Sequence, residues 1–193
     1  RFELTQDENY RNLPLSKIKS FIVPLHLATV AGLTPEEYEV VIWDEAVRGR
    51  ICDNTLPVNF DLVGLTGYTA HLPRAVELSK LFRTRGIPVA IGGAGISSLP
   101  HKYYNDFDVL FIGEAEYTWP QFLNDWRQSK HKKVYRQIRP IDLSTAPPPR
   151  WNSIKDDIAS YLLAGVQTSR GCPFDCDFCD VSYLFGRKFR HKS

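Results

Sequence analysis

The feature that most limits the fold is an alternation, between Val40 and Trp126, of short apolar β-branched runs with longer segments of helical periodicity. Short runs of this kind are typical of buried strands, and strands that alternate with helices are typical of βαβ units around a parallel sheet. The sequence therefore predicts a doubly wound, mostly parallel α/β domain. The expected strands are Val40–Trp43, Leu62–Thr66, Pro88–Ile91 and Val109–Ile112.

Three segments are expected to be helices. Pro73–Arg85 places its apolar side chains at helical spacing and stops at Gly86, a residue that commonly follows a helix end. Thr118–Gln128 and Pro24–Ala31 are expected to be the other two. A sheet of this class normally opens with a strand, and residues 1–20 hold no convincing apolar run. We therefore expect the first strand to be missing.

Composition narrows the class of protein. The chain has 193 residues, of which 43% are apolar and 24% charged, as in globular proteins. No apolar run approaches the roughly 18 to 20 residues of a membrane span, and the polar amino end does not resemble a signal peptide. These observations predict a cytoplasmic protein. Methionine is absent, so we expect a piece of a longer protein, truncated at both ends.

The charge distribution predicts more than one module. The formal net charge of +2 conceals an acidic first part, up to residue 126, and a basic remainder. Residues 127–139 contain six Lys or Arg and no acid, and Ala146–Trp151 contains three consecutive prolines. This composition is typical of a linker. We expect an α/β domain over residues 1–127, a basic and Pro-rich linker over 128–158, and a second module over 159–193.

The second module is expected to begin with a buried strand, Tyr161–Thr168, that leads into a cysteine cluster; a helix is expected near Val181. Cys172, Cys176 and Cys179 have the spacing C-x3-C-x2-C. In a reducing compartment, clustered thiols favour a metal over a disulfide. Three thiolates can hold three irons of a cubane cluster and leave the fourth iron open.

Other interpretations of these cysteines remain open. They could form a structural zinc site with His191 as a fourth ligand, or their spacing could be a coincidence. Cys52 lies far from the cluster in the sequence and is expected to be a small residue in a loop or in the core.

The run Thr168–Cys179, with Phe178 before the third cysteine, resembles the cluster loop of radical S-adenosylmethionine enzymes. The resemblance implies that Cys172, Cys176 and Cys179 bind a [4Fe-4S] cluster, whose fourth iron chelates S-adenosylmethionine. One-electron reduction would then cleave this cofactor to a 5′-deoxyadenosyl radical, with Phe178 beside the adenine. A reductant such as a flavodoxin or ferredoxin is also implied, and the fold would be the first βα unit of a partial TIM barrel.

The upstream residues resemble the cobalamin-binding subfamily of these enzymes. Five stretches match in order: Val23-Pro24-Leu25, Trp43-Asp44, Gly64-Leu65-Thr66, Ile91-Gly92-Gly93 and Gly113-Glu114-Ala115-Glu116. Ligands of doubly wound sheets bind at the carboxyl ends of the strands, where glycines let a corrinoid approach the backbone. The implied cobalamin contacts are Thr66, Gly67, Gly92, Gly93, Gly113 and Glu114.

The resemblance implies an enzyme of the methyltransferase type that acts on an unactivated carbon of a small-molecule or lipid-like substrate. We expect the parent protein to be active and this piece of it to be inactive. The alternative is a corrinoid- or zinc-binding module without radical chemistry. The basic segment 186–192 could contact an anionic group, but such runs are mostly solvated, and no nucleic-acid partner is expected.

The histidines are not expected to bind cobalt. Classical cobalamin carriers supply a lower ligand from the motif D-x-H-x-x-G, which this sequence lacks. His26 has neither the Asp nor the Gly of that motif. His71 precedes an expected helix, where a surface or capping role is the simpler interpretation.

Overall fold

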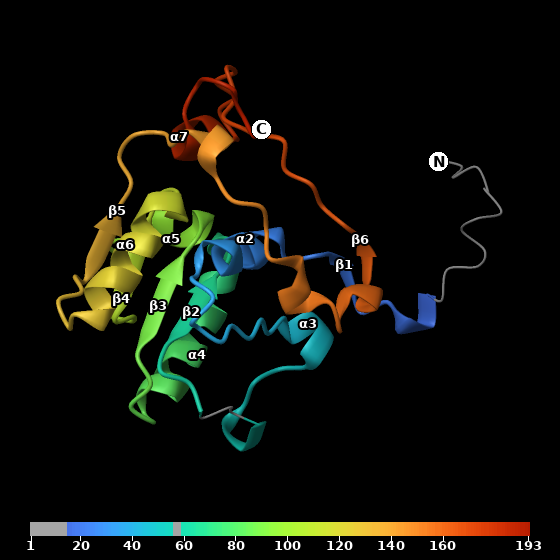
Figure 1. Ribbon diagram of the computed structural model, residues 1–193, viewed down its shortest axis with the longest axis vertical. Helices are drawn as coiled ribbons and strands as arrows, with labels where there is room; N and C mark the ends of the chain where they lie inside the picture. The colour runs from blue at the N-terminus through green and yellow to red at the C-terminus, as the bar shows by residue number, and fades with distance from the viewer. Residues whose placement is uncertain (1–14, 56–58) are drawn as a thin grey trace.

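The computed structural model describes residues 15–55 and 59–193. Its main sheet consists of four parallel strands in the spatial order β2-β3-β4-β5 (Figure 1). The strands are β2 (Val63–Thr66), β3 (Val89–Gly92), β4 (Val109–Ile112) and β5 (Val134–Arg136). The expected parallel α/β sheet is thereby confirmed, and β4 has the predicted bounds.

Helices cover both faces of this sheet. Helices α4 (Leu72–Arg83) and α5 (Ala94–Ser98) pack on one face, and α6 (Ala115–Arg127) packs on the other. Side chains alternate between the two faces along a strand. In β4, Leu110 and Ile112 therefore join the core under α4, whereas Val109 and Phe111 join the core under α6. The expected helices Pro73–Arg85 and Thr118–Gln128 are confirmed with shifted ends.

Aromatic rings fill the core under α6. Phe122 is fully buried, and its ring lies edge-on to Phe111 and Tyr135, with centroids 5.3 and 5.6 Å away. The Tyr135 hydroxyl donates to Asp125 at 2.7 Å, and the indole of Trp119 donates to Thr34 at 2.9 Å. The rings therefore pack without leaving these two polar groups unpaired.

We predict that Phe122→Ala lowers the free energy of unfolding by about 3 to 5 kcal/mol, because it removes a buried ring and leaves a cavity. Chemical denaturation measures the change. Tyr117→Ala is the matched control on the same helix, because Tyr117 is 50% exposed. Equal losses in the two variants would contradict the assignment of this core.

A second, smaller core joins residues that are distant in the sequence. Helix α2 (Leu25–Leu33) packs beside α6 and is preceded by β1 (Ser20–Ile22). Strand β1 pairs in parallel with β6 (Tyr161–Leu163) and forms a two-stranded sheet separate from the main one. The buried residues of this core come from both ends of the described chain: Val23, Ala31, Ile42, Val47, Ile154 and Tyr161.

Two predicted strands are corrected. Val40–Trp43 belongs to no strand; within this apolar run, Ile42 packs into the second core while Val41 is exposed. Tyr161–Thr168 is a strand only up to Leu163, and Val166 is 82% exposed. An apolar run indicates that side chains can be buried, but it does not indicate whether the backbone has a hydrogen-bonding partner.

The expected absence of a first strand concerned residues 1–20. Residues 1–14 lie outside the described residues, and the described part contains β1, which overlaps this range at Ser20. This strand is not part of the main sheet.

The segment expected to be a linker is packed against the rest of the protein. It supplies β5, the edge strand of the main sheet, and its Ile141 and Leu143 are buried. The proline run lies against α2, where the Arg150 amide donates to the Ala28 carbonyl at 2.8 Å. Sequence composition missed this because basic side chains at an edge strand can point to solvent while the backbone pairs.

The remaining elements are short. They are α3 (Glu45–Arg48), β7 (Ser169–Arg170), α7 (Val181–Phe185) and β8 (Arg190–His191), with β7 and β8 antiparallel. The expected helix near Val181 is confirmed as α7. The 3-10 helices are η1 (Leu15–Lys17), η2 (Asp53–Thr55), η3 (Thr69–His71), η4 (Leu143–Thr145), η5 (Trp151–Ile154) and η6 (Ile158–Ser160). No helix among the described residues has the length and apolar character needed to cross a membrane.

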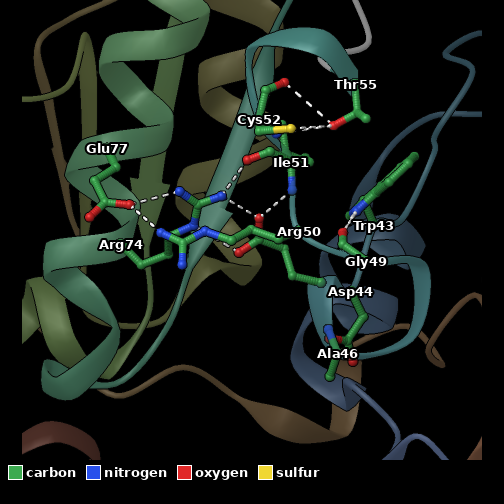
Figure 2. A network of polar contacts seen from close by, with 11 residues as sticks. Trp43, Asp44, Ala46, Gly49, Arg50, Ile51, Cys52, Thr55, Arg74 and Glu77 are labelled. Atoms are coloured by element: carbon green, nitrogen blue, oxygen red, sulfur yellow. Dashed lines mark hydrogen bonds and ion pairs between the residues drawn. The ribbon is translucent and has the colours of Figure 1, made fainter.

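An arginine on α4 ties this helix to α3 and to the loop after it (Figure 2). Arg74 donates to the two carboxylate oxygens of Glu45 at 3.0 and 2.6 Å, to the Ile51 carbonyl at 2.5 Å and to Glu77 at 2.7 Å. The Ile51 amide in turn donates to Glu45 at 2.8 Å. Hydrogen bonds from Arg74 hold the pKa of Glu45 below its ordinary value of 4.5.

We predict that Glu45→Gln lowers the free energy of unfolding at pH 7 by about 1 to 2 kcal/mol, because hydrogen bonds to a charged, half-buried carboxylate are lost. Since the folded-state pKa of Glu45 is depressed, its contribution is complete above the ordinary pKa and is lost as the pH falls through the folded value. Denaturation curves of the two proteins should therefore converge in acid.

Glu77→Gln is the matched control for this network. The Glu77 side chain is 54% exposed, so its loss should matter less than that of Glu45. A stability difference between wild type and Glu45→Gln that stayed constant from neutral pH into acid would argue against the ionic role of Glu45.

Candidate functional site

The candidate site is the carboxyl edge of the main sheet, together with the C-terminal segment that lies beyond it. Because the strands are parallel, β2, β3 and β4 end at the same edge. Thr66 and Gly92 are register partners at this edge. Figure 1 shows α7 and the red C-terminal segment beyond the strand ends, and α7 contacts α5. Residues expected to contact cobalamin and residues expected to bind a cluster therefore lie at one end of the protein.

The glycines at this edge allow neighbouring loops to pack closely. Gly93 has φ 97°, and a Cβ there would lie 2.6 Å from the Thr66 hydroxyl oxygen. A Cβ on Gly67 would lie 2.7 Å from the Cβ of His71. The close approach is therefore between parts of this chain. Thr66, Gly67, Gly92 and Gly93 remain half-buried, so this part of the edge is still accessible from outside.

Gly113, the residue after β4, also allows a neighbouring segment to pack closely. Its φ is 88°, and a Cβ there would lie 2.8 Å from the Gln137 carbonyl oxygen. The Gly113 amide donates to the Ser97 hydroxyl at 2.9 Å. Gly113 therefore lets the segment after β5 approach the end of β4.

Glu114 follows Gly113 and is buried, with 4% of its side chain exposed. It was expected to contact cobalamin, but its carboxylate is occupied by two arginines from the C-terminal segment. Arg170 and Arg190 each donate to Glu114 at 2.9 Å. The Ile141 amide donates to the same carboxylate at 3.1 Å. Glu114 therefore joins the sheet to the segment that carries the cysteines.

Glu116 completes this buried ion cluster, which consists of Glu114, Glu116, Arg170 and Arg190. A guanidinium nitrogen of Arg170 lies 2.5 Å from Glu116 Oε1. Both carboxylates lie at the N-terminus of α6, where the helix dipole favours negative charge. Burial lowers the pKa of Arg170, but the hydrogen bonds and charges of Glu116 and Glu114 outweigh burial and raise it. The two carboxylates therefore compensate the buried charge of the guanidinium.

The three clustered cysteines follow Arg170 on an irregular loop. All are free thiols; Cys176 is exposed, and Cys172 and Cys179 are half-buried. The Cys172 amide donates to the Gly186 carbonyl at 3.1 Å, and the Cys179 amide donates to the Cys176 carbonyl at 3.0 Å. Within residues 15–55 and 59–193, no three Cys, His, Asp or Glu side chains lie close enough to hold a metal ion. The thiols thus share a loop but do not converge on one point, and His191 does not complete a zinc site with them.

The other residues that the sequence analysis identifies are not part of the ion cluster. Phe178 is 91% exposed. His71 accepts a hydrogen bond from the Tyr68 amide at 3.2 Å at the start of η3, but its side chain makes no capping hydrogen bond to α4, the helix that it precedes. His26 lies in the first turn of α2. Cys52 is exposed, and hydrogen bonding to Thr55 lowers the pKa of its thiol.

Two of the basic C-terminal residues form ion pairs. Arg190 is bound to Glu114, and Arg187 forms an ion pair with Asp175. Arg190 is therefore committed to Glu114, whereas the exposed pair of Arg187 is weak. Sequence reasoning missed Arg170, Arg190 and Glu116 as partners. The sequence shows two acids in Gly113-Glu114-Ala115-Glu116 and three arginines around the cysteines, Arg170, Arg187 and Arg190, but no pattern that assigns partners.

Comparison with known proteins finds a matching family model and several similar methyltransferases. The family model described as the B12 binding domain matches residues 12–123. An uncharacterized methyltransferase of Synechocystis sp. is 35% identical over 178 residues, which cover 90% of this chain and 32% of the relative. The hopanoid C-2 methylase of Rhodopseudomonas palustris is 28% identical over 183 residues, which cover 93% of this chain and 34% of the relative.

A third relative is the bacteriochlorophyllide d C-8(2)-methyltransferase of Chlorobaculum tepidum, 28% identical over 172 residues that cover 85% of this chain and 37% of the relative. The chain spans about a third of the length of these curated relatives. The family model covers more than half of the chain and ends within α6. Together with the parallel sheet, this match shows that the chain belongs to the B12-binding domain family.

Proposed function

We propose that the chain is part of a cobalamin-dependent, methyltransferase-like enzyme, and that its cysteine loop carries the [4Fe-4S] cluster of a radical S-adenosylmethionine protein. The observation that carries the proposal is the junction at Glu114. Through this residue, a loop with three free thiols is attached to the carboxyl edge of a B12-binding sheet. The methyltransferase names of the relatives support the reaction class.

Cobalamin would be held along the accessible part of the carboxyl edge. Thr66, Gly67, Gly92, Gly93 and Gly113 are half-buried there and offer backbone groups without large side chains. The closest neighbours of these glycines are other loops of the chain, so close packing is not evidence for a ligand. The argument that cobalamin could bind there is that these residues remain accessible. Glu114 is excluded from this set because its carboxylate is buried against two arginines.

The cysteine loop fits a cluster in the kind and number of its donors, but not in their present placement. Cys172, Cys176 and Cys179 supply thiols, the ligands that iron–sulfur clusters take. Since the thiols do not converge, cluster binding would require the loop to rearrange between its ends. When bound, such a cluster supplies the electron that cleaves S-adenosylmethionine. Phe178 is exposed and free to lie beside the adenine.

The names of the relatives support a proposal for the substrate class. Their names specify methylation of hopanoids and of bacteriochlorophyllides. We propose that the whole protein methylates an unactivated carbon of a small-molecule or lipid-like substrate, and that a flavodoxin or ferredoxin supplies electrons. We place the protein in the cytoplasm, with the C-terminal module forming the start of a radical S-adenosylmethionine barrel.

We predict that the three cysteines act as one unit. After anaerobic reconstitution with iron and sulfide, the wild-type chain should be brown and hold about four irons. Replacing Cys172, Cys176 or Cys179 by Ala should abolish assembly, because each would ligate one iron. Iron content and the visible absorption spectrum measure the outcome.

Cys52→Ala is the matched control and should leave assembly intact, since Cys52 lies on a different loop beside Thr55. If Cys52→Ala alone prevented assembly, the assignment of the three ligands would be wrong. A colourless chain that retained zinc would support the alternative, a metal-binding module without radical chemistry.

We also predict that bound cobalamin takes no histidine of this chain as its lower ligand, because the chain lacks D-x-H-x-x-G. Electron paramagnetic resonance of the Co(II) form would detect superhyperfine splitting from a coordinating nitrogen. The spectrum should be the same in wild type, His26→Ala and His71→Ala. Splitting that vanished in either variant would overturn this prediction.

A further inference from the structure

We propose that Glu114 is a positioning residue that fixes both ends of the cysteine loop, defined here as residues 171–189, on the carboxyl edge of the sheet. The inference rests on the proposed function, because the loop matters for catalysis only if it carries the cluster. It concerns the chain's own ion pairs and can be tested without any cofactor.

The two arginines that bind Glu114 stand at opposite ends of this loop. Arg170 immediately precedes it, and Arg190 immediately follows it. Both reach the same carboxylate at 2.9 Å, and the two residues are register partners in the β7–β8 pair. A single buried side chain at the end of β4 therefore holds the entry and the exit of the loop together.

Burial makes this attachment strong. Only 4% of the Glu114 side chain, 11% of Arg170 and 15% of Arg190 are exposed. Removing one member of a buried ion pair is costly because the remaining charge loses its partner without returning to water. Loss of the Glu114 charge would leave Glu116 as the one carboxylate of the cluster facing two guanidinium groups.

Arg190 adds contacts that a point charge could not make. Besides both oxygens of Glu114, its guanidinium donates to the carbonyls of Ile141 and Phe185 at 2.9 Å. These contacts connect the segment after β5, the end of α7 and the N-terminus of α6. The planar fork of arginine suits such a multiple contact, whereas lysine supplies a single ammonium group.

The cysteines themselves lie between these fixed ends. Cys176 is exposed and the other two are half-buried, whereas the side chains of the ion cluster are buried. Holding the ends of a loop together lowers the entropy that must be lost when its middle is ordered. The ion cluster would thus prepare the loop to gather its thiols, and it would place them over the edge proposed for cobalamin.

The test compares backbone amide hydrogen exchange in the wild-type chain and in Glu114→Gln, without cofactors. Exchange in residues 168–172 and 184–192 should accelerate by at least about tenfold, because breaking a buried ion pair releases the segment. Exchange in β2 and β3 should stay within about twofold, as expected of a local opening. A purely structural role of Glu114 would instead raise exchange throughout the sheet.

Two further variants make the comparison specific. Asp175→Asn removes the partner of Arg187 in an exposed ion pair of the same loop, whose side chains are 70% and 60% exposed, and it should leave exchange at both loop ends unchanged. Arg190→Lys keeps the charge but loses the fork, and it should give an intermediate acceleration. This variant also serves if Glu114→Gln does not fold.

Reconstitution separates this inference from the proposed function. If the wild-type chain takes up no iron, the proposed function fails, while the exchange comparison still decides the role of Glu114. If the wild-type chain assembles a cluster, Glu114→Gln should change the line shape of its electron paramagnetic resonance spectrum, and Asp175→Asn should not. Unchanged exchange at the loop ends in both Glu114→Gln and Arg190→Lys, or equal acceleration in β3, would overturn the inference.

Discussion

The structure depends on the burial of β3 and β4 between two layers of helices. Every residue of β4 is buried, and Val89, Ala90 and Ile91 of β3 are almost fully so. Such strands can only sit in the centre of a sheet that is covered on both faces. Because they run parallel, their carboxyl ends and the loops that follow are brought to one edge. The glycine turns, the ion cluster and the cysteine loop all take their positions from this edge.

The ion cluster makes part of this edge an attachment point for the C-terminal segment. In the sequence, Gly113-Glu114-Ala115-Glu116 resembles a cofactor-binding turn, and in the structure Glu114 and Glu116 face arginines. The sheet therefore presents glycine loops to the outside along one part of its edge and buries carboxylates along another. The accessible part is suited to a ligand, and the buried part is suited to holding another segment of the chain.

The sequence predicts the elements of the main sheet well, because central strands and amphipathic helices carry strong local patterns. Val109–Ile112 is a continuous apolar run and was predicted with its true bounds. Val40–Trp43 has a similar pattern but no pairing partner, and β5 has a partner but a basic, mixed sequence. A segment forms a strand only if another strand lies beside it in the fold. The sequence of the segment alone does not show whether such a neighbour exists.

The candidate site also has parts that can be predicted from the sequence and parts that cannot. The three cysteines are recognisable from their spacing alone, because all of them lie within one short stretch. The pairing of Glu114 with Arg170 and Arg190 joins residues that are far apart along the chain, and no local pattern identifies which arginine meets which carboxylate. The glycines are expected from the sequence to let a corrinoid approach the backbone; the structure shows close approaches between them and other loops of the chain, and the corrinoid contacts stay a prediction.

The pairing of β1 with β6 also has a kinetic consequence. The main sheet is built from neighbouring segments that can associate as soon as each βαβ unit is complete, whereas Ser20 must meet Tyr161 across most of the chain. Contacts between distant segments carry a larger loop-closure cost and form more slowly than local ones. During synthesis, β1 leaves the ribosome long before its partner exists. Strand β1 must therefore remain without this partner until the segment that leads to the cysteines has been made.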